Sequence, residues 1–402
     1  MGECSSIERQ LVERAADACR LDEVRAWAAV NSGSANLQGL ATMADLLAAR
    51  MAVLPGTLNL RDPGPVTALD PAGRTLDVSH GKHLHLVVRP DAPRQLLLTG
   101  HMDTVYAADH AFQQVRDLAD GRVNGPGVAD MKGGLAVMIA ALQAFEQHPG
   151  AAWTGYEVII NSDEEVGSAS SAPLIAEAAR GKLAALTYEP SALPDGTLAG
   201  ARPGSGNFSF DIRGRSAHAG RNPEDGRNAV TAAAELALRL EALRRDGLTV
   251  NVARLDGGSP NNVVPDHAIL RVNLRPRTPE LEAAARKGIE AAVREVAAAR
   301  DVQIHRHGGF GRRPKPLDAA ALRLFALVEQ AGRDLGQQIT HKDSGGVCDG
   351  NNIAACGVPV VDTMGVRGGA IHSADEYLIP QSLGERAGLS ALVLARLAKG
   401  AL

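Results

Sequence analysis

Two patterns of predicted strands and helices follow one another in this chain of 402 residues, which is longer than a single hydrophobic core usually grows. Apolar strand candidates at 84–88, 95–99, 156–160 and 183–188 alternate with helical segments, which is typical of a mainly parallel sheet covered on both faces. After Gly196 the order becomes strand, helix, two strands, helix and strand, the ferredoxin-like arrangement. From Asp318 the alternation resumes. We therefore predict an α/β domain (1–197 and 312–402) with a small α+β domain (198–311) inserted.

Within the inserted domain, the periodicity predicts strands at 207–212, 248–255, 267–274 and 302–307, with helices at 225–245 and 279–299. The glycines of Gly308–Gly311 predict a hinge at its end.

Composition excludes several functional classes. The formal net charge is -4 and aromatic residues make up 3%, so a nucleic-acid partner is not expected. The longest apolar stretch, Gly133–Phe145, is too short to cross a bilayer, and the N-terminus lacks the basic and apolar regions of a secretory signal. The four cysteines form no CxxC pair. We expect a cytoplasmic protein with free thiols and no membrane partner.

Five short segments place histidines or carboxylates just after apolar runs. They are Leu-Leu-Leu-Thr-Gly-His101-Met-Asp103, Gly-Val-Ala-Asp130-Met-Lys-Gly-Gly, Asn-Ser-Asp-Glu164-Glu165-Val-Gly, Leu-Thr-Tyr-Glu189-Pro and Ile-His372-Ser-Ala-Asp-Glu. Ligands of open α/β sheets bind beyond the carboxyl ends of the strands, so these segments can converge on one site.

Histidine and carboxylate side chains suit Zn²⁺ in tetrahedral sites. Our hypothesis is that Asp130 bridges two Zn²⁺ ions, that His101 and Glu189 complete one site, and that Glu165 and His372 complete the other. Each ion then keeps an open position for a shared hydroxide. Four positive metal charges would be balanced by three carboxylates and that hydroxide.

Two further carboxylates have predicted roles. Asp103 lies two residues from His101 on the same strand face, where it could accept the second ring N–H. Glu164 neighbours a ligand and is the natural general base for the bridging water. Each segment taken alone is more typical of a solvated loop end, but the five together supply complementary ligands.

These segments resemble the co-catalytic zinc metallopeptidases of the M20 family, in particular its bacterial glutamate carboxypeptidases. Acetylornithine deacetylases and succinyl-diaminopimelate desuccinylases are more distant relatives. The resemblance extends from about residue 25 to the end, with the motifs in family order. It implies the ligand roles above, a zinc-peptidase-like catalytic domain, an inserted lid and dimerisation domain, and a cis peptide bond at Asp130–Met131. Two Zn²⁺ per chain are implied, with Co²⁺ or Mn²⁺ as substitutes.

The resemblance also implies functional residues near the inserted domain. His218 would reach the active site of a partner subunit in a homodimer and polarise the scissile carbonyl. Asn262 would lie near the substrate carboxylate, and Arg275 would clamp it. Gly345 and Gly346 match a turn that lines the substrate pocket. A second carboxylate contact falls to Arg312 or Arg313, between which the sequence does not choose.

One departure concerns the substrate, because Thr197 stands near the position where glutamate-specific relatives carry a lysine. A hydroxyl cannot make that ion pair, so a neutral or aromatic side chain is an equal expectation. The predicted function is a carboxypeptidase-type hydrolase that cleaves the amide bond of an N-acyl or peptidyl amino acid with a free C-terminal carboxylate. One alternative is a deacylase acting on a small acyl group, and another is a catalytically dead dimeric binding protein.

Overall fold

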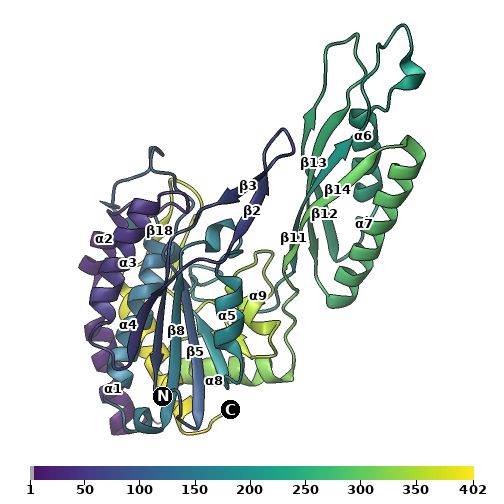
Figure 1. The fold of residues 1–402 in the computed structure, drawn as a ribbon. Helices are drawn as coiled ribbons and strands as arrows, with labels where there is room; N and C mark the ends of the chain where they lie inside the picture. The colour runs from purple at the N-terminus through teal and green to yellow at the C-terminus, as the bar shows by residue number, and fades with distance from the viewer. Residues whose placement is uncertain (1–3) are drawn as a thin grey trace.

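A six-stranded sheet forms the centre of the catalytic domain in the computed structural model, which describes residues 4–402 (Figure 1). Its strands, in spatial order, are β1 (Thr57–Arg61), β4 (His83–Val88), β8 (Thr154–Asn161), β5 (Arg94–His101), β9 (Ala184–Thr187) and β16 (Val360–Val361). Strands β8, β5, β9 and β16 are parallel, whereas β1 and β4 pair antiparallel at one edge. The mainly parallel sheet is therefore confirmed.

Helices cover both faces of this sheet. The larger core contains residues of α1 (Ser6–Ala18), α2 (Leu21–Ala28), α3 (Leu37–Met51), α4 (Gly134–Phe145), α8 (Ala319–Asp334) and α10 (Gln381–Ala398). The smaller core lies under α5 (Ala172–Ala179) and α9 (Asp349–Ala354). Along β5, Leu96 and Leu98 face the larger core and Leu97 faces the smaller one, because successive strand residues point to opposite faces.

One segment, Val128–Phe145, is long and apolar enough by composition to cross a membrane, but 94% of it is buried inside the fold. A helix that is apolar all round is the kind that a large soluble core encloses. Helix α4 therefore serves as the central packing element of the larger core.

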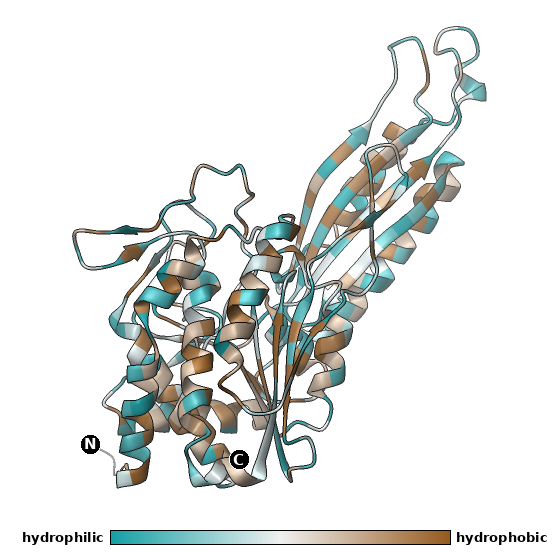
Figure 2. Ribbon diagram, turned by 60° about the vertical axis from the view of Figure 1, so that its left-hand side comes forward, coloured by the Kyte–Doolittle hydropathy of each residue, from teal (hydrophilic) through white to brown (hydrophobic). Residues whose placement is uncertain are grey.

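The inserted domain, called the lid below, has a four-stranded antiparallel sheet in the order β12-β13-β11-β14. Its elements are β11 (Ser205–Arg213), α6 (Ala229–Glu241), β12 (Leu248–Gly257), β13 (His267–Pro276), α7 (Pro279–Arg300) and β14 (Gln303–Arg312). This is the predicted ferredoxin-like arrangement. The lid strands alternate between hydrophobic and hydrophilic residues in Figure 2, and Phe208, Phe210 and Ile212 pack under the two helices.

Two local predictions for the lid were wrong. Helix α6 starts at Ala229 rather than Asp225, because the Asn228 side chain accepts the Thr231 backbone N–H and caps the helix there. The glycines Gly308–Gly311 do not form a separate hinge. They continue strand β14, which pairs with β11 as far as Arg312.

Shorter strands connect the loops around the sheet. They are the pair β10 (Leu198–Ala199) and β15 (His341–Lys342), the sheet of β17 (Gly368–Gly369), β18 (Tyr377–Leu378), β7 (Val123–Asn124) and β6 (Arg116–Asp117), and the hairpin of β2 (Val66–Leu69) and β3 (Thr75–Val78). The hairpin reaches toward the lid (Figure 1), where Thr67 hydrogen-bonds His307 at 3.0 Å and Arg271 donates to the Leu69 carbonyl at 3.1 Å.

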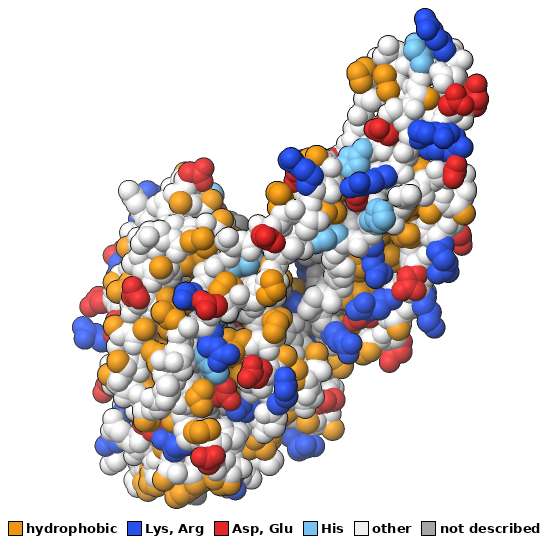
Figure 3. All heavy atoms as spheres, in the orientation of Figure 1, with side chains coloured by type: hydrophobic (Ala, Val, Ile, Leu, Met, Phe, Trp, Pro, Cys, Tyr) orange, Lys and Arg blue, Asp and Glu red, His pale blue; other side chains and the backbone are white. Residues whose placement is uncertain are grey.

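Charged side chains of both signs are interspersed over the face of the molecule shown in Figure 3. Among the described residues, all four cysteines are free thiols, as predicted.

Candidate metal centre

The five predicted ligands come from five separate segments. His101 ends β5, Glu165 lies in a 3-10 turn (Glu164–Val166) after β8, and Glu189 follows β9. Asp130 lies in the turn Val128–Gly133 before α4, and His372 lies between β17 and β18. Strands β5, β8 and β9 are parallel, so their carboxyl ends meet at one edge of the sheet.

The side chains of these residues converge around Asp130. Asp130 Oδ1 lies 3.1 Å from His101 Nε2, and Asp130 Oδ2 lies 3.3 Å from His372 Nε2. Glu189 Oε2 is 3.6 Å from the His101 ring, and Glu165 Oε2 is 3.2 Å from the His372 ring. The two oxygens of one carboxylate thus face two separate histidine–glutamate pairs, which is the arrangement a bridging ligand requires.

Ligand atoms within 4.8 Å of one another define two overlapping groups, His101 with Asp130 and Glu165, and His101 with Glu164 and Glu189. Such a set of imidazole and carboxylate ligands suits a pair of divalent ions such as Zn²⁺. The Asp130–Met131 peptide bond is cis, as the family resemblance implied. His372 has a φ of 62°, a conformation that residues other than glycine rarely adopt and that is common at functional sites.

Burial and mutual interaction shift the pKa values of this cluster. Hydrogen bonds to Asp130 and Glu165 raise the pKa of His372 to about 11. Burial, followed by the charge of Asp130, raises the pKa of Glu165 to about 7. Burial opposes ionisation of Asp130, but hydrogen bonds from both histidines outweigh it and hold the Asp130 pKa below its ordinary range. Cations in this cluster would stabilise the ionised carboxylates.

Asp103 organises the turn that carries the two glutamates. Its carboxylate accepts the backbone N–H groups of Glu164 at 3.1 Å and Glu165 at 3.2 Å, and the Ser34 hydroxyl at 2.7 Å. The His101 Nδ1 atom lies 3.0 Å from the Asp103 backbone carbonyl and 3.4 Å from its carboxylate. Asp103 therefore contacts both the ring of His101 and the turn of Glu164.

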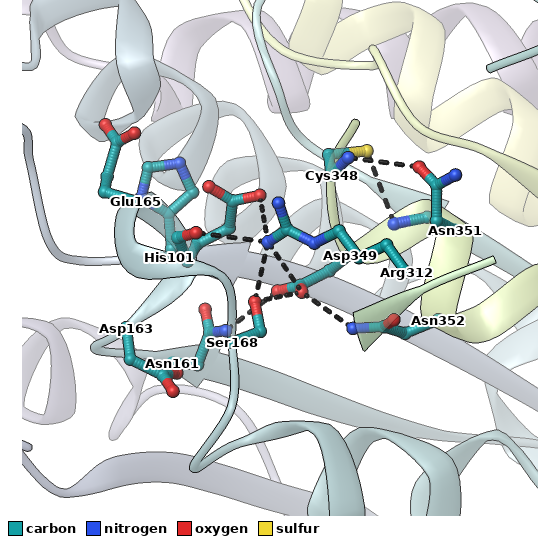
Figure 4. A network of polar contacts seen from close by, with 12 residues as sticks. His101, Asn161, Asp163, Glu165, Ser168, Arg312, Cys348, Asp349, Asn351 and Asn352 are labelled. Atoms are coloured by element: carbon teal, nitrogen blue, oxygen red, sulfur yellow. Dashed lines mark hydrogen bonds and ion pairs between the residues drawn. The ribbon is translucent and has the colours of Figure 1, made fainter. Parts of the chain in front are cut away.

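Arg312, the last residue of β14, lies against the predicted general base. Its guanidinium donates to Glu164 Oε1 at 2.7 Å and to the Ser168 hydroxyl at 2.8 Å, and it lies 3.6 Å from Asp349. Figure 4 shows Arg312, Ser168 and Asp349 pointing toward one another. Burial raises the pKa of Glu164 well above its ordinary value, although the Arg312 charge opposes this shift. The predicted second arginine therefore contacts the base.

A cavity of 450 Å³ opens beside the cluster. Asp130, Glu164, Glu165, Glu189 and His372 line one side, and the other residues are mainly apolar, among them Pro190, Ala192, Pro194, Val347 and Ile371.

Arg202 also lines this cavity. It makes a bidentate contact with Asp362 at 2.8 and 3.1 Å, and Lys315 lies 3.0 Å from the same carboxylate. The sequence reasoning missed this buried cluster, because no spacing joins residues so far apart.

The lid residues predicted as substrate contacts fall into two places. Arg275 donates to the Gly345 carbonyl at 3.2 Å, and Gly346 lines the cavity, so these three lie together at the junction of lid and catalytic domain. The His218 ring accepts hydrogen bonds from Gly220 and Arg221, and Asn262 accepts the Ala219 N–H through its backbone. His218 and Asn262 are therefore neighbours within the lid, apart from the residues that line this cavity.

Thr197 is buried, and its hydroxyl lies 3.2 Å from that of Thr340. It is not among the residues that line the 450 Å³ cavity. Arg202, five residues further along the chain, lines the cavity.

The fold and the clustered ligands define the metallopeptidase class. Residues 97–396 match the model of peptidase family M20/M25/M40, and the chain belongs to this family. It is 28% identical to carboxypeptidase G2 of Pseudomonas sp. (strain RS-16), over 92% of this chain and 87% of the relative. It is 27% identical to succinyl-diaminopimelate desuccinylase 2 of Shewanella loihica, over 75% and 85% of the two chains.

The fold is shared with the YXEP protein of Bacillus subtilis, described as a dinuclear metal binding peptidase from the M20 family. The TM-score is 0.62 at 16% identity, over 98% of this chain and 99% of that chain.

Proposed function

We propose that this chain is a two-metal amidohydrolase of carboxypeptidase type, with Zn²⁺ as its metal. The observation that carries the proposal is the position of Asp130, whose two carboxylate oxygens face His101 and His372 separately. Three protein ligands per ion leave a coordination position open, as catalytic sites require. A catalytically dead binding protein would have no need for a complete ligand set beside a carboxylate placed to act as the base.

The chain's own residues then have distinct tasks. Two bound ions would supply an activated water and polarise the substrate carbonyl. Glu164, which lines the cavity, takes the proton from the attacking water and passes it to the leaving amine. Arg312 holds one oxygen of this carboxylate at 2.7 Å, and the other oxygen is the one proposed to take the proton.

The substrate carboxylate is proposed to bind at the junction of Arg275 and the Gly345–Gly346 turn. A guanidinium fits a carboxylate bidentately. Within residues 4–402, Arg275 donates to two neutral acceptors, the Gly345 carbonyl and the Asn273 side chain, so it can accept an anionic partner. The remainder of the substrate would lie in the cavity.

A neutral side chain or acyl group fits the cavity better than a second carboxylate. Arg202 in its wall is held by both oxygens of Asp362, and most of the other wall residues are apolar. A substrate carboxylate there would be desolvated mainly against apolar residues, which is costly.

We also propose a homodimer in which the lid of one subunit completes the site of the other. His218 and Asn262 lie together in the lid and do not line the cavity of their own chain. A second copy is the natural source of a carbonyl-polarising imidazole.

Release of free amino acid from a panel of N-acyl amino acids and dipeptides tests the activity, with and without a chelator and added Zn²⁺. We expect metal-dependent hydrolysis, no turnover with Glu164→Ala, and unchanged turnover with Glu177→Ala, an exposed control. Full activity of Glu164→Ala would contradict the mechanism. The deacylase alternative is favoured if small N-acyl substrates are cleaved and dipeptides are not.

A further inference from the structure

Glu376 is a buried carboxylate that none of the steps above uses, and its side chain is only 1% exposed. It lies four residues after His372, immediately before β18. Its two oxygens point at the loop that carries Asp130.

Four donors satisfy this carboxylate. Glu376 Oε1 accepts the backbone N–H groups of Ala129 at 2.9 Å and Asp130 at 3.0 Å. Glu376 Oε2 accepts the Gly127 N–H at 3.1 Å and the Tyr106 hydroxyl at 2.9 Å. Hydrogen bonds to a charged acceptor are among the strong ones, so the ionised carboxylate fits this cradle and a neutral group does not.

The same segment also contacts β7, which precedes the Asp130 loop in the chain, and Tyr106. Asn124 donates its side-chain N–H to the Glu376 carbonyl at 2.8 Å, and β18 pairs with β7 through Tyr377 and Asn124. Tyr106 also donates to the Ser373 carbonyl at 2.8 Å. Glu376 thus joins the loop of Asp130 to the segment that carries His372.

We propose that Glu376 is a positioning residue for the metal pair. It sets the distance between Asp130 and His372 by holding the backbone of one ligand loop against the segment of the other. Because Asp130 faces both histidines, displacement of its loop weakens both metal positions together. Residues behind metal ligands commonly have such an effect, and their substitution costs about 10–100-fold in metal affinity or activity. The inference rests on the proposed two-metal function.

Titration of the metal-free protein with Co²⁺, followed by its visible absorption, tests this proposal without reference to turnover. The variants are Glu376→Gln, Tyr106→Phe and, as a matched control on α10, Glu385→Gln, whose carboxylate pairs with Arg367 at 3.0 Å. We expect Glu376→Gln to weaken the binding of both ions about 10–100-fold, since its amide N–H₂ would face backbone N–H donors. Tyr106→Phe, which removes one donor, should cause a smaller loss, and Glu385→Gln none.

Binding of two Co²⁺ ions by Glu376→Gln with the affinity of the unaltered chain would overturn the positioning role and leave the two-metal function standing. Failure of the unaltered chain to bind two ions would instead overturn the two-metal function itself. If Glu376→Gln does not fold, Tyr106→Phe decides the question, because it keeps the charge. Unchanged Co²⁺ affinity of folded Tyr106→Phe would then contradict the proposal.

Discussion

The Glu164 carboxylate and the Arg312 guanidinium lie 2.7 Å apart, and this contact joins the proposed general base to the strand by which the chain leaves the lid. Arg312 also donates to the Glu164 backbone carbonyl at 3.1 Å. The orientation of the base therefore depends on the position of β14, so a movement of the lid would be transmitted to it.

Replacing Arg312 by Met should lower kcat by about 10–100-fold, because Glu164 loses the partner that orients it. Metal content should stay at the level of the unaltered chain, since Arg312 contacts no ligand in the pairs around Asp130. Steady-state kinetics and metal analysis check both expectations. Arg306→Met, an exposed arginine on the same strand, is the control. An unchanged kcat for Arg312→Met would show that the contact does not serve catalysis.

Replacing Arg275 by Lys should raise KM more than it lowers kcat. The ammonium keeps the charge but loses the planar pair of donors that fits a carboxylate. Loss of a contact made equally in the ground and transition states appears in KM. With a substrate whose C-terminal carboxylate is replaced by a carboxamide, Arg275→Lys and the unaltered chain should have the same KM. If the KM difference persists with the carboxamide substrate, Arg275 does not act by binding the substrate carboxylate.

Replacing Asp362 by Asn should reduce the free energy of unfolding by about 3–5 kcal/mol at pH 7, because Arg202 and Lys315 are left buried without their carboxylate. Burial alone would raise the Asp362 pKa, but the two cations outweigh burial and hold it below the usual value. A carboxyl with a lowered pKa stabilises the fold above its unfolded pKa and loses that contribution as the pH falls through the folded pKa.

The stability gap between the unaltered chain and Asp362→Asn should therefore narrow below about pH 4. Urea unfolding at a series of pH values measures it. A gap that stays constant down to pH 2 would contradict the assignment of the ion cluster.

Four of the five ligands could be predicted from the sequence because each follows an apolar strand or opens an apolar helix, as His101 and Asp130 do, whereas His372 follows the short glycine strand β17. The sequence of strands and helices along the lid could likewise be predicted from its periodicity. The start of α6 was less predictable, because the Asn228 cap rather than the apolar pattern sets where the helix begins.

The supporting contacts could not be predicted in the same way. Arg312 and Glu164 are 148 positions apart, and Arg202 and Asp362 are 160 apart, so no local spacing signals either pair. Glu376 had one usable signal, an acidic residue four positions after a predicted ligand. Three of its four donors are backbone N–H groups, which no residue type signals in the sequence, and the fourth is the distant Tyr106 hydroxyl.

Metal content per chain tests the central claim most directly. We predict two Zn²⁺ or Co²⁺ ions per chain after reconstitution and dialysis, measured by elemental analysis. Asp130→Asn should bind neither ion stably, because one residue serves both positions, while Glu385→Gln should bind two. Two ions retained by folded Asp130→Asn, or fewer than two in the unaltered chain, would contradict a metal pair bridged by Asp130.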